Sequence, residues 1–166
     1  MLTAVVGINW GDEGKGRMVD LLSKDFEIVS RYQGGNNAGH TVVNERGEFI
    51  LNLLPSGILR EDTLNVMGQG MVVDIQHLYE EVGRLEAKGV SVTPRNLAIS
   101  DRAVICMPYH KMLDGMEEDR LAGHKFGSTR RGIAPVYADR AMKKVIRMAD
   151  LLEPDTLREK VENIVE

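Results

Sequence analysis

The sequence has little cysteine, few aromatic residues and no long hydrophobic run. A single cysteine, Cys106, excludes an internal disulfide, and we expect a buried thiol in a reducing cytoplasm rather than a nucleophile. Residues 1–8 lack the basic start and apolar length of a signal peptide. No run approaches the roughly 20 apolar residues of a membrane span. A net charge of −4 argues against general nucleic-acid binding, so any affinity for phosphate should be local.

The rest of the composition is that of a globular protein. Hydrophobic residues make up 43% and charged residues 28%, while 17 glycines indicate many tight turns. A chain of this length can bury roughly 70% of the surface that it exposes when unfolded. We expect residues 1–166 to form a single α/β domain. Its predicted features are a mainly parallel central sheet with flanking helices, a P-loop-like phosphate site and a small β-hairpin insertion.

The first 22 residues predict a strand, a glycine-rich loop and a helix. Residues 2–8 are apolar and β-branched, and the apolar residues after Gly14 fit one helical face: Met18, Val19, Leu21 and Leu22. Glycine N–H groups at a helix N-terminus make an anion site, to which Lys15 adds a cation. The alternative is a tight strand-to-helix turn that uses glycine only for positive φ.

This loop departs from the Walker A pattern. Gly7 lies too far from Gly14, and Gly16 follows the lysine where Walker A has a hydroxyl residue that binds magnesium. Another ligand must then hold any metal. Asp12 is the candidate, because Mg²⁺ prefers one or two carboxylates together with phosphate oxygens.

Further along the chain, patterns of apolar residues and turns predict the remaining elements. We expect strands at 27–32, 64–67 and 97–100, a hairpin formed by 41–43 and 49–53, and helices at 74–88, 108–121, 136–152 and 154–166. If strands 2–8 and 27–32 are parallel neighbours, the loops that follow them converge at one sheet edge. His77 and His110 lack partners at metal-ligand spacing, so we interpret them as structural or surface residues. The basic loop 122–135 suits a monophosphate, or is a solvated surface loop.

Five motifs follow one another along the chain: GDEGKG at 11–16, Val19-Asp20, RYQGGNNAGHT at 31–41, PSGILR at 55–60 and GIAP at 132–135. Together they closely resemble adenylosuccinate synthase. The resemblance runs from residue 1 to about residue 152, we expect it to continue to residue 166, and family members are usually more than twice as long as this chain. We therefore expect the N-terminal part of such an enzyme.

The resemblance implies a GTP-dependent ligase of purine biosynthesis. GTP would phosphorylate O6 of inosine monophosphate (IMP), and L-aspartate would displace phosphate from 6-phosphoryl-IMP to give adenylosuccinate. It also implies Mg²⁺ as the cofactor and a homodimer. The alternative is a non-catalytic nucleotide-binding or dimerisation fragment, because the family's guanine and aspartate sites lie beyond residue 166 and the chain has no Asn/Thr-Lys-x-Asp signature. A generic GTPase switch is weaker, since the Walker hydroxyl is absent.

The resemblance also implies roles for individual residues. Asp12 would be the general base and His40 the proton donor, while Asp12 and the Gly39 carbonyl would bind Mg²⁺. The residues implied to contact the GTP phosphates are Gly11, Asp12, Glu13, Gly14, Lys15, Gly16, Arg17, Gly39, His40 and Thr41. Those implied to contact IMP are Asp12, Glu13, Gly14, Lys15, Asn37, Ala38, Gly39, His40, Thr129 and Lys143.

The chain departs from the common family pattern at two places. The family often has glycine at the positions of Arg130 and Ala134, so the sequence does not decide the conformation of this loop. Near Lys143 and Lys144 the family commonly has an arginine that reaches across the homodimer to the partner's nucleotide phosphate. Lysine keeps that charge but lacks the bidentate fork.

Overall fold

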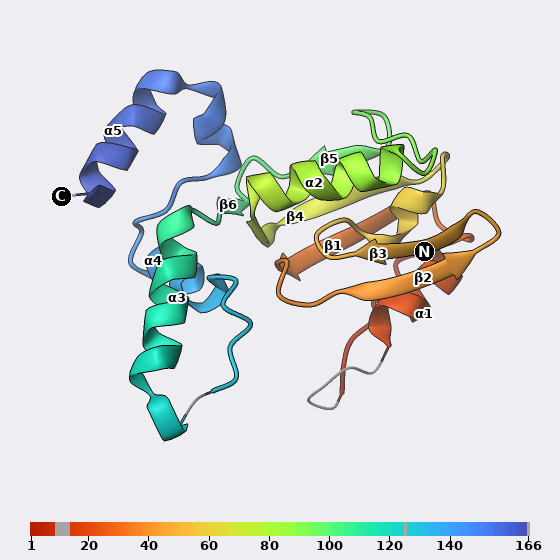
Figure 1. Cartoon of the computed structure of the whole chain (residues 1–166). Coiled ribbons are helices and arrows are strands. Elements are labelled where there is room, and N and C mark those ends of the chain that lie inside the picture. The colour runs from red at the N-terminus through yellow and green to blue at the C-terminus, as the bar shows by residue number, and fades with distance from the viewer. Residues whose placement is uncertain (9–13, 125, 166) are drawn as a thin grey trace.

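The computed structural model describes residues 1–8, 14–124 and 126–165 (Figure 1). Its helices and strands are, in chain order, α1 (Lys15–Ser23), β1 (Ile28–Gly34), β2 (His40–Asn44), β3 (Gly47–Leu51), the 3₁₀ turn η1 (Ser56–Leu59), β4 (Leu64–Val73), α2 (Ile75–Glu86), β5 (Leu97–Ile99), β6 (Val104–Ile105), α3 (Pro108–Arg120), η2 (Ala122–His124), α4 (Ile133–Ala141), η3 (Met148–Leu152) and α5 (Pro154–Val165).

Strand β4 is the centre of a parallel sheet. It pairs with β1, with β5 and, at its end, with β6, all in the same direction. It is longer than the predicted strand 64–67 because Gly68 and Gly70 allow it to continue against the backbone of Tyr32. The register of β1 on β4 shifts between Arg31 and Gln33. The parallel sheet confirms the predicted fold class.

Two hydrophobic clusters cover β4. In the larger one, Met67 and Met71 of β4 pack with Leu85 of α2 and with Phe49 and other residues of the hairpin. In the smaller one, the neighbouring residue Val72 packs with β6 and α4. Successive residues of β4 thus meet different layers, as the side-chain alternation of a strand requires. α2 and the hairpin lie on one side of the sheet in Figure 1, and α4 beside α3.

Several sequence predictions are confirmed. The hairpin is the antiparallel pair β2 and β3, with Asn44 opposite Gly47. Helix α2 begins after Asp74, whose side chain accepts a hydrogen bond from the His77 N–H, as an N-cap should. Strand β5 and helices α3 and α5 also lie where they were predicted, whereas β6 was missed because two residues carry no pattern.

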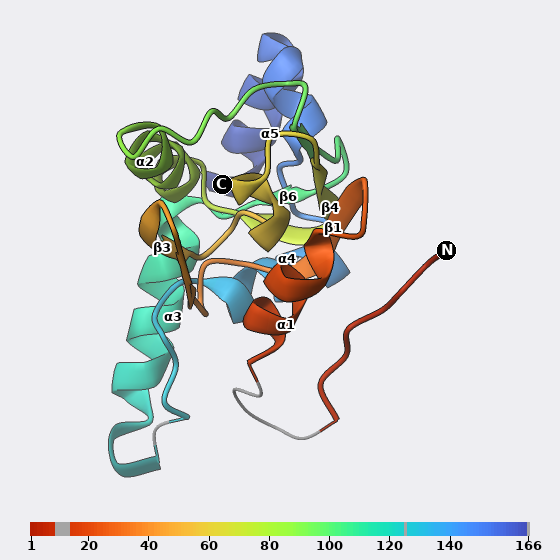
Figure 2. The same cartoon turned by 90° about the vertical axis from the view of Figure 1, so that its right-hand side faces the viewer.

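The predicted strand at residues 2–8 is wrong. These residues form no strand, and Leu2 and Ile8 are 96% and 94% exposed. Figure 2 shows the segment extending away from the sheet. An apolar, β-branched run becomes a strand only when a neighbour pairs with its backbone, and the described strands pair with one another instead.

The faces and ends of two helices also differ from prediction. In α1 the expected apolar face is divided, because Val19 and Leu22 are half-buried while Met18 and Leu21 are exposed. The predicted helix 136–152 is α4 instead, which starts at Ile133 and ends at Ala141.

The chain leaves α4 through a left-handed residue. Lys143 has φ 63°, and the N–H groups of Lys143 and Lys144 bond back to the carbonyls of Arg140 and Asp139, which closes the helix. Arg147 then forms an isolated antiparallel β-bridge with Val104, before η3 begins. Among the residues described, no helix combines the length and apolarity that crossing a bilayer demands.

Candidate functional site

The described part of the predicted phosphate loop begins at Gly14. Three predicted site residues lie outside the described residues: Gly11, Asp12 and Glu13. The Gly14 carbonyl accepts a hydrogen bond from the Met18 N–H at 3.1 Å, in the first turn of α1. Lys15 and Gly16 are half-buried, whereas Arg17 is exposed. The described residues therefore supply a helix N-terminus and a lysine, two elements of an anion site.

His40 meets the first turn of α1. Its Nε2 lies 2.8 Å from the Ser56 hydroxyl oxygen, and this hydroxyl also lies 3.1 Å from the carbonyl oxygen of Gly16. Gly16 itself lies against the imidazole ring, so that a Cβ there would come within 2.8 Å of three ring atoms. The first turn of α1 thus meets His40 at the start of β2. The predicted convergence relied on residues 2–8 being a strand beside 27–32, and the loop before α1 at residues 9–13 lies outside the described residues.

The loop between β1 and β2 is solvent-exposed at Asn37, Ala38 and Gly39. Gly39 packs against the side chain of Asn52, and an added Cβ would lie 2.5 Å from Asn52 Nδ2. Asn52 Oδ1 in turn lies 3.2 Å from His77 Nε2. The predicted nucleotide-contacting residues are therefore accessible, on a loop supported from behind by Asn52.

The start of this loop is attached to two helices through a buried carboxylate. Asp74 accepts hydrogen bonds from Asn36 Nδ2 at 3.0 Å and from Lys111 Nζ of α3 at 2.5 Å. Burial alone would raise the pKa of Asp74, but the hydrogen bonds from Lys111, the His77 N–H and Asn36 keep that pKa below its ordinary value. Asp74 therefore joins the loop to α2 and α3 as a charged anchor.

Residues 52–54, which follow β3, are held between two opposite charges. Arg31 donates hydrogen bonds to the carbonyls of Asn52, Leu53 and Gly35. On the other side, the Glu81 carboxylate accepts from the N–H groups of residues 52, 53 and 54 at 2.8, 2.9 and 3.2 Å. Glu81 is fully buried, and burial lowers the pKa of Arg31. These two side chains fix the segment that supports Gly39.

The loop that carries Thr129 is held by α3. Glu118 accepts hydrogen bonds from three consecutive backbone N–H groups, those of Phe126, Gly127 and Ser128. One helical turn earlier, Asp114 accepts from the Ser128 hydroxyl at 2.6 Å and from the Gly132 N–H at 2.8 Å. Thr129 is exposed at the tip of this arrangement.

Arg130 has a left-handed backbone conformation of the kind that favours glycine. Its φ is 55°, and its N–H donates to the Ser128 hydroxyl at 3.1 Å. Its guanidinium pairs with Asp119 of α3 at 2.6 Å. An arginine thus adopts the left-handed conformation here, at a steric cost of about 1–2 kcal/mol.

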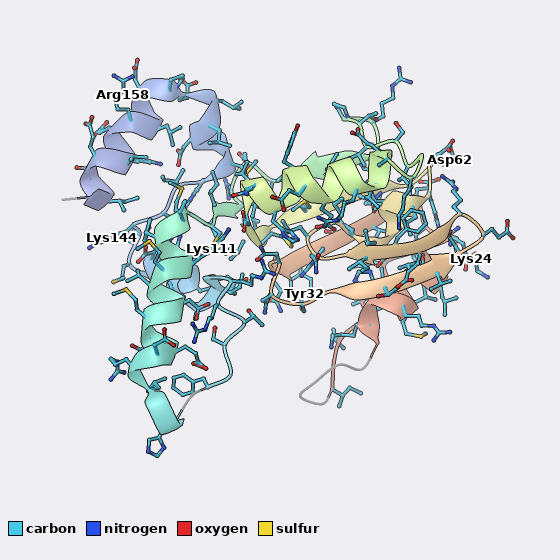
Figure 3. The ribbon with its side chains drawn as sticks, viewed as in Figure 1. Lys24, Tyr32, Asp62, Lys111, Lys144 and Arg158 are labelled. Atoms are coloured by element: carbon cyan, nitrogen blue, oxygen red, sulfur yellow. The ribbon has the colours of Figure 1, made fainter. Side chains whose placement is uncertain are left out.

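Lys143 lies in a different part of the molecule. It lines a cavity of about 520 Å³ between the end of α4, η3 and α5, together with Arg102, Lys144, Arg147 and Lys160. The neighbouring Lys144 is labelled in Figure 3 on the side of α4 and α5, opposite Lys24 at the end of α1. The structure therefore groups Gly14–Gly16 with His40 and Gly39, and carries Thr129 and Lys143 on separate elements.

The two histidines interpreted as structural do make structural contacts. His110 is buried, accepts from the Met107 N–H at Nδ1 and lies 3.1 Å from Asp139 of α4 through Nε2. Burial lowers its pKa, although the Asp139 hydrogen bond opposes this. Cys106 is buried as expected, and burial raises its thiol pKa to about 11. Within the described ranges, no group of three or more His, Cys, Asp and Glu residues is arranged to hold a metal ion.

Sequence reasoning missed the residues that support the loops. Ser56 was noted only as part of the PSGILR motif, and Glu81 was not singled out. A signal for Glu81 was present: it stands within the apolar stripe of α2, between Leu78 and Leu85 and beside Val82. An acid on a buried face needs hydrogen-bond partners, so its position indicated a structural role.

Comparison with known proteins identifies relatives along nearly the whole chain. Residues 4–166 match the family model for adenylosuccinate synthetase. The adenylosuccinate synthetase of Clostridium novyi is 50% identical over 157 residues, which cover 95% of this chain and 37% of the relative. That of Heliobacterium modesticaldum is 51% identical over 161 residues, which cover 97% and 37%. The chain thus spans less than two fifths of these curated relatives.

Solved structures agree with this result. The structure of fully ligated adenylosuccinate synthetase from Plasmodium falciparum has a TM-score of 0.85 and 33% identity, covering 96% of this chain and 37% of that one. A succinoaminodeoxyadenylate synthetase of cyanophage S-2L, with a TM-score of 0.63 and 23% identity, covers 87% of this chain and 39% of that one. The second likeness supports the fold alone.

Proposed function

Because this chain belongs to the adenylosuccinate synthetase family, we propose that it carries the phosphate-binding part of a GTP-dependent ligase site. In the proposed reaction, GTP phosphorylates O6 of IMP, and L-aspartate then displaces phosphate to give adenylosuccinate, GDP and phosphate. The observation that carries the proposal is the meeting of the α1 N-terminus with His40 through Gly16 and Ser56. This arrangement joins an anion site to a group able to transfer a proton.

The chemistry gives each residue a separate task. Removal of the IMP N1 proton makes O6 nucleophilic, and Asp12 is the proposed base. As the phosphoryl group moves, negative charge develops on it and on the departing diphosphate. Lys15 and the N–H groups at the start of α1 would stabilise that charge, and His40 would donate a proton. Arg17 and Thr41 are proposed to contact the GTP phosphates.

Mg²⁺ is the proposed cofactor, and the Gly39 carbonyl is a suitable ligand for it. Gly39 is exposed, and its carbonyl offers the hard oxygen that Mg²⁺ prefers. Mg²⁺ takes few protein ligands beside phosphate oxygens and water, so Gly39 and Asp12 would suffice. When bound, the ion would supply positive charge beside the phosphates.

IMP is proposed to contact Asn37, Ala38 and Thr129 of the same chain, and Lys143 of a second copy in a homodimer. The cavity lined by Lys143 supports this division, because its lining includes residues of η3 and α5 and does not include His40 or Thr129. The exposure of Asn37 and Thr129 agrees with ligand contact. We also propose that the protein acts in the cytoplasm.

A second candidate is a nucleotide-binding or dimerisation role without catalysis. It concerns these 166 residues taken alone, which span 37% of the relative from Clostridium novyi. Under this reading the 166 residues bind triphosphate weakly and form no adenylosuccinate, because positioning of all reactants supplies much of the rate in such transfers.

Both candidates are tested by titrating the mass-verified chain with Mg²⁺ and GTP, and separately with IMP, while backbone amide signals are followed by NMR. We expect GTP to shift the amides of Lys15, Gly16 and His40. Asp12→Asn should weaken this response when Mg²⁺ is present. An absence of shifts at about 1 mM of either nucleotide would contradict nucleotide binding. A parallel assay of adenylosuccinate formation should give no product, and measurable GTP- and aspartate-dependent turnover would select the complete ligase.

A further inference from the structure

Three segments distant in sequence surround the ring of His40. α1 contributes the backbone of Gly16, β2 carries His40 itself, and η1 contributes the hydroxyl of Ser56. Ser56 is only 3% exposed, so water has little access to compete for its hydroxyl. The contact between α1 and η1 brings these groups together.

The hydrogen bonds of Ser56 determine the role of one ring nitrogen of His40, Nε2. A serine hydroxyl has one hydrogen to donate and two lone pairs to accept with. The Gly16 carbonyl, 3.1 Å away, can only accept, so the hydroxyl hydrogen points to it. The 2.8 Å contact between Ser56 and His40 is then a hydrogen bond only if Nε2 carries a hydrogen and donates it.

The second constraint comes from the missing side chain of Gly16. A Cβ built at this position would lie within 2.8 Å of the ring atoms Cγ, Cδ2 and Nδ1, much closer than real side-chain contacts. The ring therefore lies flat on the backbone of α1, where only glycine leaves room. A Walker A loop has serine or threonine after its lysine, and that residue type would displace His40 from its place here.

We propose that Gly16 and Ser56 are positioning residues for His40: Gly16 provides the space for the ring, and Ser56 holds the proton of the neutral ring on Nε2. The inference rests on the proposed function, because the proton-transfer role of His40 is what gives this orientation a use.

The orientation is measurable without nucleotides. The chain has four histidines, so long-range ¹⁵N–¹H NMR can resolve their ring nitrogens, and His40→Gln identifies the signals of His40. At about pH 8.5, where histidines are neutral, we expect a protonated Nε2 and an unprotonated Nδ1 in the parent chain. A protonated Nδ1 in the parent would overturn the proposal without any variant.

Two variants with matched controls test each residue separately. Ser56→Ala should give His40 a mixture of tautomers, whereas the exposed Ser91→Ala should leave it unchanged. Gly16→Ala should abolish the nuclear Overhauser contact between the His40 ring and the residue 16 α-hydrogen. Gly83→Ala is its control, since that helical glycine has open space at its Cβ position. Unchanged His40 signals in both test variants, with folding verified by circular dichroism, would refute the positioning roles.

The outcomes separate this inference from the proposed function. If the proposed function fails, GTP and IMP shift no signals in any variant, while the tautomer and the ring contact still report on Gly16 and Ser56. If only the positioning inference fails, nucleotides bind the parent and both test variants alike. Support for both requires nucleotide-induced shifts in the parent and an altered response of His40 in Gly16→Ala.

Discussion

The substitution Glu81→Gln tests whether the buried charge frame stabilises the fold. The carboxylate is fully buried and accepts three backbone N–H groups, two at Oε1 and one at Oε2. Glutamine has nearly the same shape, so packing is preserved. It presents an amide N–H₂ group to at least one of those donors, which leaves a buried N–H without an acceptor.

The magnitude follows from these contacts. One lost hydrogen bond to a charged group costs about 1.5–3 kcal/mol, and the bonds that remain become neutral and weaker. The half-buried guanidinium of Arg31, which interacts electrostatically with Glu81, also loses an opposite charge. Together, the lost hydrogen bond and the weakening of the others lead us to expect that Glu81→Gln lowers the free energy of unfolding by about 3–5 kcal/mol.

The assay is urea unfolding followed by circular dichroism, with thermal unfolding as a second measurement. For a chain of this size, 3–5 kcal/mol corresponds to a fall in Tm of roughly 6–20 °C. The control is Glu80→Gln on the same helix, where the exposed carboxylate accepts a hydrogen bond from Gln76 at 3.1 Å. We expect the control to change stability by less than about 0.5 kcal/mol. A loss below about 1 kcal/mol in Glu81→Gln would refute the argument.

Three further predictions concern residues outside this frame. Because burial lowers the pKa of His110, the unfolded chain binds more protons, so unfolding free energy should fall as pH drops below about 6.5, and His110→Gln should flatten this dependence in urea titrations. With a thiol pKa of about 11, Cys106 should react with an alkylating reagent at pH 8 about 10²-fold more slowly than free cysteine, and comparable rates would contradict its burial. Lys143→Gly should raise stability by up to about 1 kcal/mol by relieving the positive φ, whereas Lys144→Gly should not, as thermal unfolding of both can show.

The elements that sequence analysis found are those with local signals. The hairpin has its turn residues between two apolar runs, and α2 has an N-cap at Asp74 and a regular apolar stripe. The contact of His40 with α1 could not be derived in this way, because the predicted convergence assumed that residues 2–8 form a strand beside 27–32. The prediction of a strand at residues 2–8 was wrong because an apolar, β-branched pattern indicates that a segment can pair, but it does not indicate a partner strand.

The supports of the candidate site could not be predicted in the same way, because their partners lie far along the chain. Arg31 bonds to residues 52 and 53, Glu81 to residues 52–54, and Ser56 joins Gly16 to His40. Each is a polar group that would cost free energy if it were buried alone, so each must have a partner. The sequence can therefore indicate that such a group is satisfied, but only the fold says by which residue. At Glu81, the position of an acid within an apolar stripe indicated that the carboxylate must have partners. The fold shows that these partners are the backbone N–H groups of residues 52–54. A search for single polar residues on otherwise apolar faces is thus the step by which sequence analysis can find positioning residues that no glycine-rich or histidine motif contains.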